Sequence, residues 1–171
     1  MDSKIKIFTI LACTICSFVL AGCEKHNWAE WKVQNELWLE NNKSASGVHV
    51  SSTGLQYRII ADPTPQDAIP NENSTISCDY KLTLINGVVI ESGSAKFNLS
   101  NTIPGFREGC HKIHNNGDIE LFIPAYLGYD YSKYQSNDYE HAEGNGTEGT
   151  QGYIPPYSTL IYTVHICGVS L

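Results

Sequence analysis

The stretch from Ile76 to Leu84 constrains the fold of this chain more than any other. Apolar and polar side chains alternate along its whole length, and the apolar set comprises Ile76, Cys78, Tyr80, Leu82 and Leu84. Successive side chains of a β-strand point to opposite faces, so this period of two predicts a strand with one buried face. Asn86-Gly87 follows and favours a tight hairpin turn. The segment therefore predicts an antiparallel sheet with one face in the core.

A single short helix is expected to cover that face. Phe106, Gly109, Cys110 and Ile113 have the i, i+3, i+4, i+7 spacing of one buried helix face. Further strands are predicted at residues 55–60, 88–90, 97–99, 119–123 and 160–167, with loops at 62–73 and 129–152. A mostly antiparallel sheet whose apolar face is covered by one helix is an α+β domain.

A second helix is predicted before the sheet and ends near Asn42. Asn27 and Glu30 form a start that resembles a capping box, in which Asn27 caps and Glu30 reaches back. The loosely helical apolar set is Trp28, Trp31, Leu37 and Trp38. We expect the Trp side chains to pack on the domain, while a dimerisation helix remains the alternative.

The N-terminus has the three parts of an export signal. Lys4 and Lys6 precede a short apolar stretch, which ends at Leu20-Ala21-Gly22-Cys23. This ending resembles the bacterial lipobox, which implies cleavage before Cys23 and a lipid on its thiol that holds the chain to a membrane. The predicted organisation is a signal peptide at 1–22, a lipid-anchored tether and helical extension at 23–47, and a globular domain at 48–171. The expected location is the cell envelope, facing the periplasm or the cell surface.

Charge and ligand spacing exclude two classes of partner. The formal net charge is −7 and no basic cluster is present, which argues against nucleic acid. His111 and His114 lack a third ligand at suitable spacing, so they are interpreted as surface residues and not as a metal site. A loop group is interpreted as solvated or partner-binding: Asp138, Glu140, His141 and Glu143.

Three cysteines remain after the signal and Cys23 are set aside. Cys78 lies on the inward face of its predicted strand, Cys110 on the inward face of the helix, and Cys167 on the opposite face of the last strand. If one bridge forms, Cys78 to Cys110 is the geometrically favoured pair. Two buried free thiols that act as small hydrophobes are the open alternative.

Several segments in order resemble the FKBP family of peptidyl-prolyl isomerases. Residues 97–109, Phe-Asn-Leu-Ser-Asn-Thr-Ile-Pro-Gly-Phe-Arg-Glu-Gly, are similar to the family's Phe-x-Leu-x-x-Val-Ile-x-Gly-Trp-x-Glu-Gly run. Residues 121–129 and 154–162 resemble its two Ile-Pro segments, and Tyr80 to Gly87 matches its Tyr and hairpin Gly. Gly54-Leu55-Gln56-Tyr57 after a helix resembles the bacterial exported branch with an N-terminal extension. The implied fold is a curved antiparallel sheet wrapped around one short helix.

The resemblance also implies a site without metal or cofactor. Its catalytic positions would be Tyr80, Glu91, Ile103, Phe106, Tyr129 and Tyr162, and its substrate-binding positions Ile90, Thr102 and Ile154. Phe106 would be the floor, while the Ile103 N–H and the Tyr129 hydroxyl would bind substrate carbonyls. The implied partners are proline-containing polypeptide clients and macrolide-type inhibitors, and a monomer is expected.

Several positions depart from the family pattern. Ile90-Glu91 replaces Phe-Asp, Ala95 replaces a pocket aromatic, Asp130 replaces a Gly, and Tyr162 replaces Phe. The loop between Tyr129 and Ile154 is also enlarged.

The hypothesis is an isomerase that assists the folding of exported proteins. Its rivals are a catalytically weak chaperone or protein-binding lipoprotein of the same fold, and a surface lipoprotein whose loop binds glycan or protein.

Overall fold

The structure is a computed structural model that describes residues 28–63, 67–131 and 144–171. The helices of this part are α1 (Ala29–Asn42) and α2 (Pro104–Cys110), with 3-10 turns η1 (Leu99–Asn101) and η2 (Ala125–Leu127). Its strands are β1 (His49–Val50), β2 (Gln56–Ala61), β3 (Thr75–Thr83), β4 (Val89–Asn98), β5 (Asp118–Ile123) and β6 (Leu160–Ser170).

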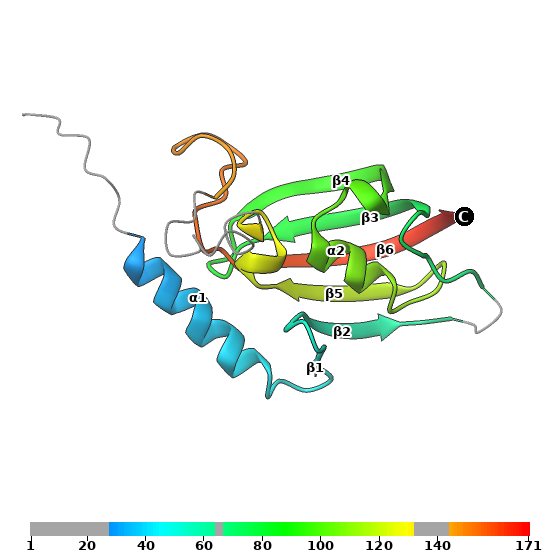
Figure 1. The fold of residues 1–171 in the computed structure, drawn as a ribbon, viewed down its shortest axis with the longest axis horizontal. Helices are drawn as coiled ribbons and strands as arrows, with labels where there is room; N and C mark the ends of the chain where they lie inside the picture. Colours follow the sequence, from blue (N-terminus) through cyan, green and yellow to red (C-terminus); the bar gives the residue numbers. More distant parts are fainter. Residues whose placement is uncertain (1–27, 64–66, 132–143) are drawn as a thin grey trace, which may run out of the picture.

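The strands form one antiparallel sheet in the order β1-β2-β5-β6-β3-β4 (Figure 1). The period of two predicted from the sequence is confirmed in β3 and β6, because their inward side chains are buried and the residues between them are more exposed. The buried members are Ile76, Cys78, Leu82, Leu160, Tyr162, Val164 and Ile166. The predicted α+β fold, a curved sheet around a short helix, is therefore confirmed.

Helix α2 crosses the buried face of the sheet and lies close to β5. A Cβ atom on Gly105 would lie 2.4 Å from Ile123 Cγ2, and one on Gly109 would lie 2.3 Å from Leu121 Cδ2. The two glycines are four residues apart and face the same strand, so the helix approaches the sheet more closely than a side chain would allow. The predicted helix face is buried, although the helix ends at Cys110, before Ile113.

The prediction of two short strands at 88–90 and 97–99 is wrong. One continuous strand, β4, runs from Val89 to Asn98 and pairs with β3 along its length. Its middle residues carry no apolar alternation because β4 is an edge strand and these side chains are exposed. Backbone pairing with β3, which leaves no pattern in the sequence, holds this part of the strand.

Helix α1 occupies the predicted range but begins differently. The N-cap residue is Trp28, with no side-chain cap, and Glu30 accepts a hydrogen bond from Gln34 Nε2. The capping-box prediction is therefore wrong at Glu30, and Asn27 lies outside the described residues. Leu37, expected on the packed face, has 58% of its surface exposed, whereas Asn35 is 1% exposed.

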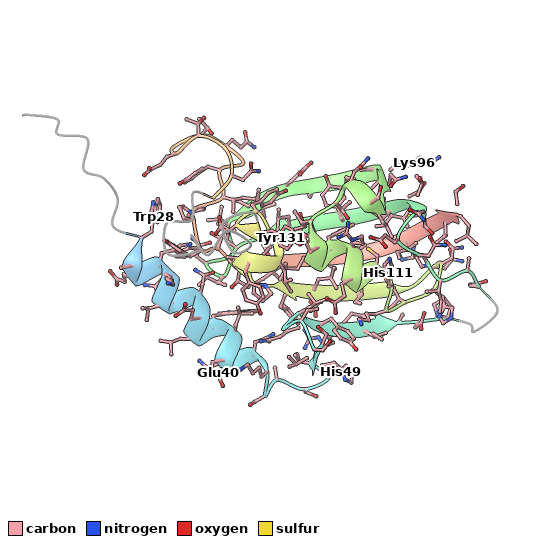
Figure 2. The ribbon with its side chains drawn as sticks, viewed as in Figure 1. Trp28, Glu40, His49, Lys96, His111 and Tyr131 are labelled. Atoms are coloured by element: carbon pink, nitrogen blue, oxygen red, sulfur yellow. The ribbon has the colours of Figure 1, made fainter. Side chains whose placement is uncertain are left out.

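The Trp side chains of α1 pack on the domain, as predicted. Trp38 contacts Phe122 of β5 at 5.7 Å between ring centroids. Trp31 Nε1 donates to Ser158 Oγ at 3.0 Å. Figure 2 shows Trp28 at the first turn of the helix, where its ring lies 6.3 Å from that of Tyr153.

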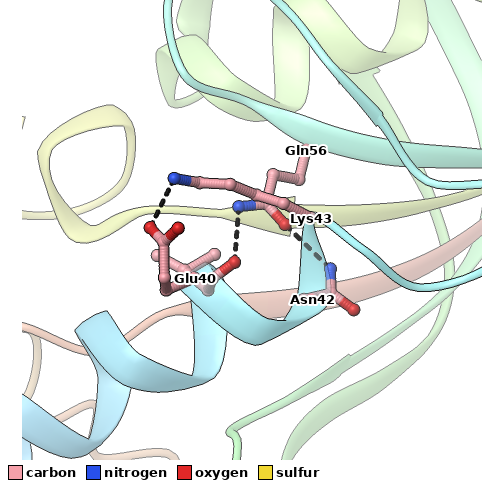
Figure 3. A network of polar contacts seen from close by, with 5 residues as sticks. Glu40, Asn42, Lys43 and Gln56 are labelled. Carbon is pink, nitrogen blue, oxygen red and sulfur yellow. Dashed lines mark hydrogen bonds and ion pairs between the residues drawn. The ribbon is translucent and has the colours of Figure 1, made fainter.

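Polar contacts fix both the middle and the end of α1. Asn35 Oδ1 accepts the Thr159 N–H at 2.7 Å, and its Nδ2 donates to the Trp31 carbonyl at 2.8 Å. At the C-terminal end, Gln56 Nε2 donates to the Leu39 carbonyl at 2.9 Å, and Asn42 Nδ2 donates to Gln56 Oε1 at 3.0 Å (Figure 3). The extension is thus part of the domain's packing.

The three cysteines in the described part of the chain are free thiols. Cys78 and Cys110 are buried and Cys167 is exposed, which agrees with the faces predicted for them and with the alternative of small buried hydrophobes. Burial raises the pKa of Cys78 to about 11, so this thiol stays protonated at neutral pH.

The export signal and Cys23 lie outside the described residues. Within the part of the chain that the structure describes, no helix has both the length and the apolar character needed to span a bilayer.

Asn35→Ala should destabilise the protein. The change leaves the buried Thr159 N–H without its acceptor, which costs about 1–3 kcal/mol. Urea denaturation followed by circular dichroism measures the loss as a lower transition midpoint. Asn41→Ala, at an exposed position of the same helix, is the control and should leave the midpoint nearly unchanged. Equal midpoints for Asn35→Ala and wild type would contradict the role given to Asn35.

Candidate functional site

A cavity of about 220 Å³ opens between helix α2 and the strands β3, β4 and β6. Each of these elements supplies side chains from its inner face, so residues far apart in the sequence meet there. The lining residues are Tyr80, Glu91, Phe97, Asn101, Thr102, Ile103, Phe106, Tyr129 and Tyr162.

Aromatic rings form the floor and walls of the cavity. Phe106 and Tyr162 are only 4% and 7% exposed, and their ring centroids are 5.1 Å apart in an edge-to-face arrangement. Phe97 packs against Phe106 at 5.7 Å and against Tyr80 at 5.4 Å, again edge to face. Such contacts hold the rings without filling the space between them, so an apolar cup remains.

The polar groups of the cavity lie at its rim. The Tyr80 hydroxyl donates a hydrogen bond to Glu91 Oε1. Burial, followed by the hydrogen bond to Glu91, raises the pKa of Tyr80 to about 12. The Tyr162 hydroxyl lies near Tyr129, and burial, followed by the proximity of Tyr129, raises the pKa of Tyr162 well above its usual value. Both phenols are therefore neutral at physiological pH.

The residue directly before α2 supplies a backbone hydrogen-bond donor. Ile103 is the N-cap residue of the helix, directly after Thr102, whose hydroxyl donates to the Leu99 carbonyl at 2.8 Å. Among the residues that the structure describes, none accepts a hydrogen bond from the Ile103 N–H. Ile103 lines the cavity, so this N–H is available to a ligand there.

Seven of the nine residues named from the sequence lie around this one cavity: Tyr80, Glu91, Thr102, Ile103, Phe106, Tyr129 and Tyr162. Ile90 and Ile154 are not among its lining residues. Ile154 is 3% exposed and belongs to the hydrophobic core, and Ile90 packs against that core from β4. Their predicted role as substrate contacts has no support from their position in this structure.

The sequence reasoning missed Phe97 and Asn101. Both lie within the 97–109 run that carries the family resemblance, and Phe97 pairs with the buried Ile76 across the two strands. The inward face of Phe97 could have been inferred from that pairing if β4 had been recognised as one strand. Ala95, expected to replace a pocket aromatic, is half-buried but does not line the cavity.

The other side chains considered as metal ligands do not lie at this cavity. His114 Nδ1 lies 3.0 Å from Asp62 Oδ1 in a surface pair, and no group of three metal-binding side chains occurs in the part of the chain described. The loop group at 138–143 lies outside that part.

A wider hollow of about 500 Å³ lies over the outer sheet face, where Asp79, His165 and Asp118 stand on neighbouring strands. Neither Phe106 nor Tyr162 is among its lining residues.

Comparison with known proteins places the chain in a family. The family model for FKBP-type peptidyl-prolyl cis-trans isomerases matches residues 66–167. Outer membrane protein MIP of Legionella longbeachae is 32% identical over 145 residues, which cover 82% of this chain and 54% of the relative. FkpA of Escherichia coli K12 is 30% identical over 146 residues, which cover 82% of this chain and 47% of the relative.

Solved structures agree with this placement. The crystal structure of FkpA from Escherichia coli superposes with a TM-score of 0.67 at 30% identity, covering 83% of this chain and 60% of that one. A peptidyl-prolyl isomerase of Pseudomonas syringae has the same TM-score at 18% identity, covers 85% of this chain and 98% of its own, and shows the shared fold alone. The chain spans about half the length of the curated relatives it matches. With the family model covering more than half of its residues, this chain belongs to the FKBP-type peptidyl-prolyl cis-trans isomerase family.

Proposed function

We propose that this chain is a peptidyl-prolyl cis-trans isomerase that assists the folding of exported proteins. The observation that carries the proposal is the aromatic cup over Phe106, with donors placed only at its rim. A prolyl ring is small and apolar, and the cup offers an apolar space of about 220 Å³. Family membership supports the same activity.

The reaction needs neither a nucleophile nor a metal. Amide resonance sets a barrier of about 18–20 kcal/mol to rotation about a peptide bond. An enzyme lowers that barrier if it binds the twisted amide more tightly than either planar isomer. The twisted amide has lost resonance and is less polar, so a water-poor aromatic surface favours it over the planar forms. Phe106, Tyr162 and Phe97 supply that surface.

The rim donors would hold the chain on either side of the rotating bond. The Ile103 N–H and the Tyr129 hydroxyl both lie at the cavity, and each would bind a substrate carbonyl. Tyr80 is engaged with Glu91, which fixes the wall between β3 and β4. With these carbonyls held, binding energy from the flanking residues orients the prolyl ring and allows rotation of the amide.

The proposed location is the cell envelope. The segment up to Cys23 has the features of a lipoprotein signal, and one relative carries the name outer membrane protein. We infer the domain boundaries predicted above, with the signal at 1–22 removed and a lipid on Cys23. Because α1 packs on the domain, residues 29–42 of the 23–47 range belong to the folded body.

Tyr129→Phe should lower kcat/KM by up to about tenfold, because one hydrogen bond to the transition state is lost. An isomer-exchange assay by NMR on an Xaa-Pro peptide measures the rate. Tyr131→Phe is the matched control, because Tyr131 is similarly exposed and does not line the cavity. No enhancement by the wild type, together with suppression of client aggregation, would favour the catalytically weak chaperone instead.

The isomerase rate should not follow ionisation of Tyr80 or Tyr162 below about pH 10, because both phenols keep their protons there. A raised pKa in the folded state means that Tyr80 contributes stability below its unfolded value of about 10, and this contribution is lost as pH rises toward about 12. Urea midpoints measured across this alkaline range should fall less steeply in Tyr80→Phe than in wild type. The same slope in both proteins would contradict the assignment.

Cys23→Ala should abolish lipid attachment in a bacterial host, because the acylated thiol is removed. Incorporation of labelled palmitate and partition between membrane and aqueous fractions measure the effect. Cys167→Ala, which changes an exposed thiol of the folded domain, should leave both unchanged. Label that persists in Cys23→Ala would show that the lipid is attached to another residue.

A further inference from the structure

Asp130 is a buried carboxylate next to the pocket residue Tyr129. Only 3% of its surface is exposed, and the family pattern has a Gly at this position. Its Oδ1 accepts the Gly144 N–H at 3.1 Å, and its Oδ2 accepts the Tyr157 N–H at 2.8 Å. Burying a charge is costly unless strong hydrogen bonds compensate, and here both oxygens have backbone donors.

The two donors lie on either side of the far end of the enlarged loop, Gly144 within it and Tyr157 just after it. A short antiparallel bridge between Asn145 and Ile154 links the two segments that carry them. Tyr157 has a φ of 64°, a backbone region that a non-glycine residue enters at a cost. The hydrogen bond from its N–H to Asp130 helps to hold it in that conformation.

Helix α1 fixes the same returning segment from the other side. Asn35 accepts the Thr159 N–H, Trp31 donates to Ser158, and Lys32 lies 5.2 Å from the Tyr157 ring centroid. The segment 157–159 is therefore a rigid support, and Asp130 ties the backbone beside Tyr129 to it.

Tyr129 needs such a support because its own packing is slight. Its side chain is 39% exposed, and its hydroxyl lies near that of Tyr162. The direction of its side chain is therefore set mainly by the backbone at 129–130. A shift of about 1 Å in a group that binds substrate can cost a large part of its catalytic effect.

We propose that Asp130 is a positioning residue for the isomerase site: it joins the two ends of the enlarged loop and so holds the Tyr129 hydroxyl over the Phe106 floor. The inference rests on the proposed function and extends it, because it explains how a site with a longer loop keeps its rim donor in place. It also gives α1 a part in the site, through the segment that Asp130 binds.

The test is a double-mutant cycle of Asp130→Asn and Tyr129→Phe, with kcat/KM measured by isomer exchange on an Xaa-Pro peptide. The amide keeps the shape of the carboxylate but turns one acceptor into a donor that faces a backbone N–H. We expect Asp130→Asn alone to lower kcat/KM by up to about tenfold, as Tyr129→Phe does. In the Tyr129→Phe background, the same change should cost less than about twofold, because the positioned hydroxyl is already absent.

The controls separate positioning from stability and charge. Glu72→Gln removes a negative charge at an exposed site and should leave kcat/KM unchanged. Circular dichroism checks that Asp130→Asn is folded, and if it is not, Asp130→Gly, the residue of the family pattern, takes its place in the cycle. An active wild type with independent, multiplicative effects of the two changes would overturn this inference alone. A wild type without rate enhancement would overturn the proposed function and the inference with it.

Discussion

The structure depends on how closely α2 approaches β5. Gly105 and Gly109 allow the helix to lie where any side chain would collide with Ile123 or Leu121. Phe106 is on the same helix, so this approach fixes its depth relative to the sheet. Had the helix been held farther out, Phe106 would lose its edge-to-face contact with Tyr162, and the cup would have no floor. The packing that builds the core therefore also builds the site.

Residues that are distant in the sequence meet at the site because strands that are distant in the sequence are neighbours in the sheet. β6, the last strand, lies between β5 and β3, so Tyr162 meets Tyr80 although they are far apart in the sequence. The helix residues come from the crossing between β4 and β5. The rings from these elements contact one another edge to face, an arrangement that fixes each ring through its neighbours. A cavity framed in this way keeps its shape without a ligand, which lowers the ordering cost of binding a flexible chain.

The sequence predicted the parts of the fold that leave a periodic pattern. Alternation in β3 and β6 and the spacing of α2 follow from burial on one face, and the family resemblance located most of the cavity lining. The continuous β4 could not be predicted, since its exposed middle is held by backbone pairing. Asn35 was missed because a polar residue at a helical spacing gives no sign that its amide will be buried against Thr159.

The polar departures from the family pattern are accommodated in the folded chain. Glu91 is a methylene longer than the family's Asp, yet it still reaches the Tyr80 hydroxyl. Tyr162 adds a hydroxyl, which lies beside Tyr129 at the rim of the cavity. Asp130 adds a buried charge, and hydrogen bonds from the Gly144 and Tyr157 N–H groups stabilise it. Each added polar group therefore lies beside a polar neighbour, since an unpaired one is costly in a buried site. The floor of the cavity stays apolar, with Phe106 where the family run has Trp.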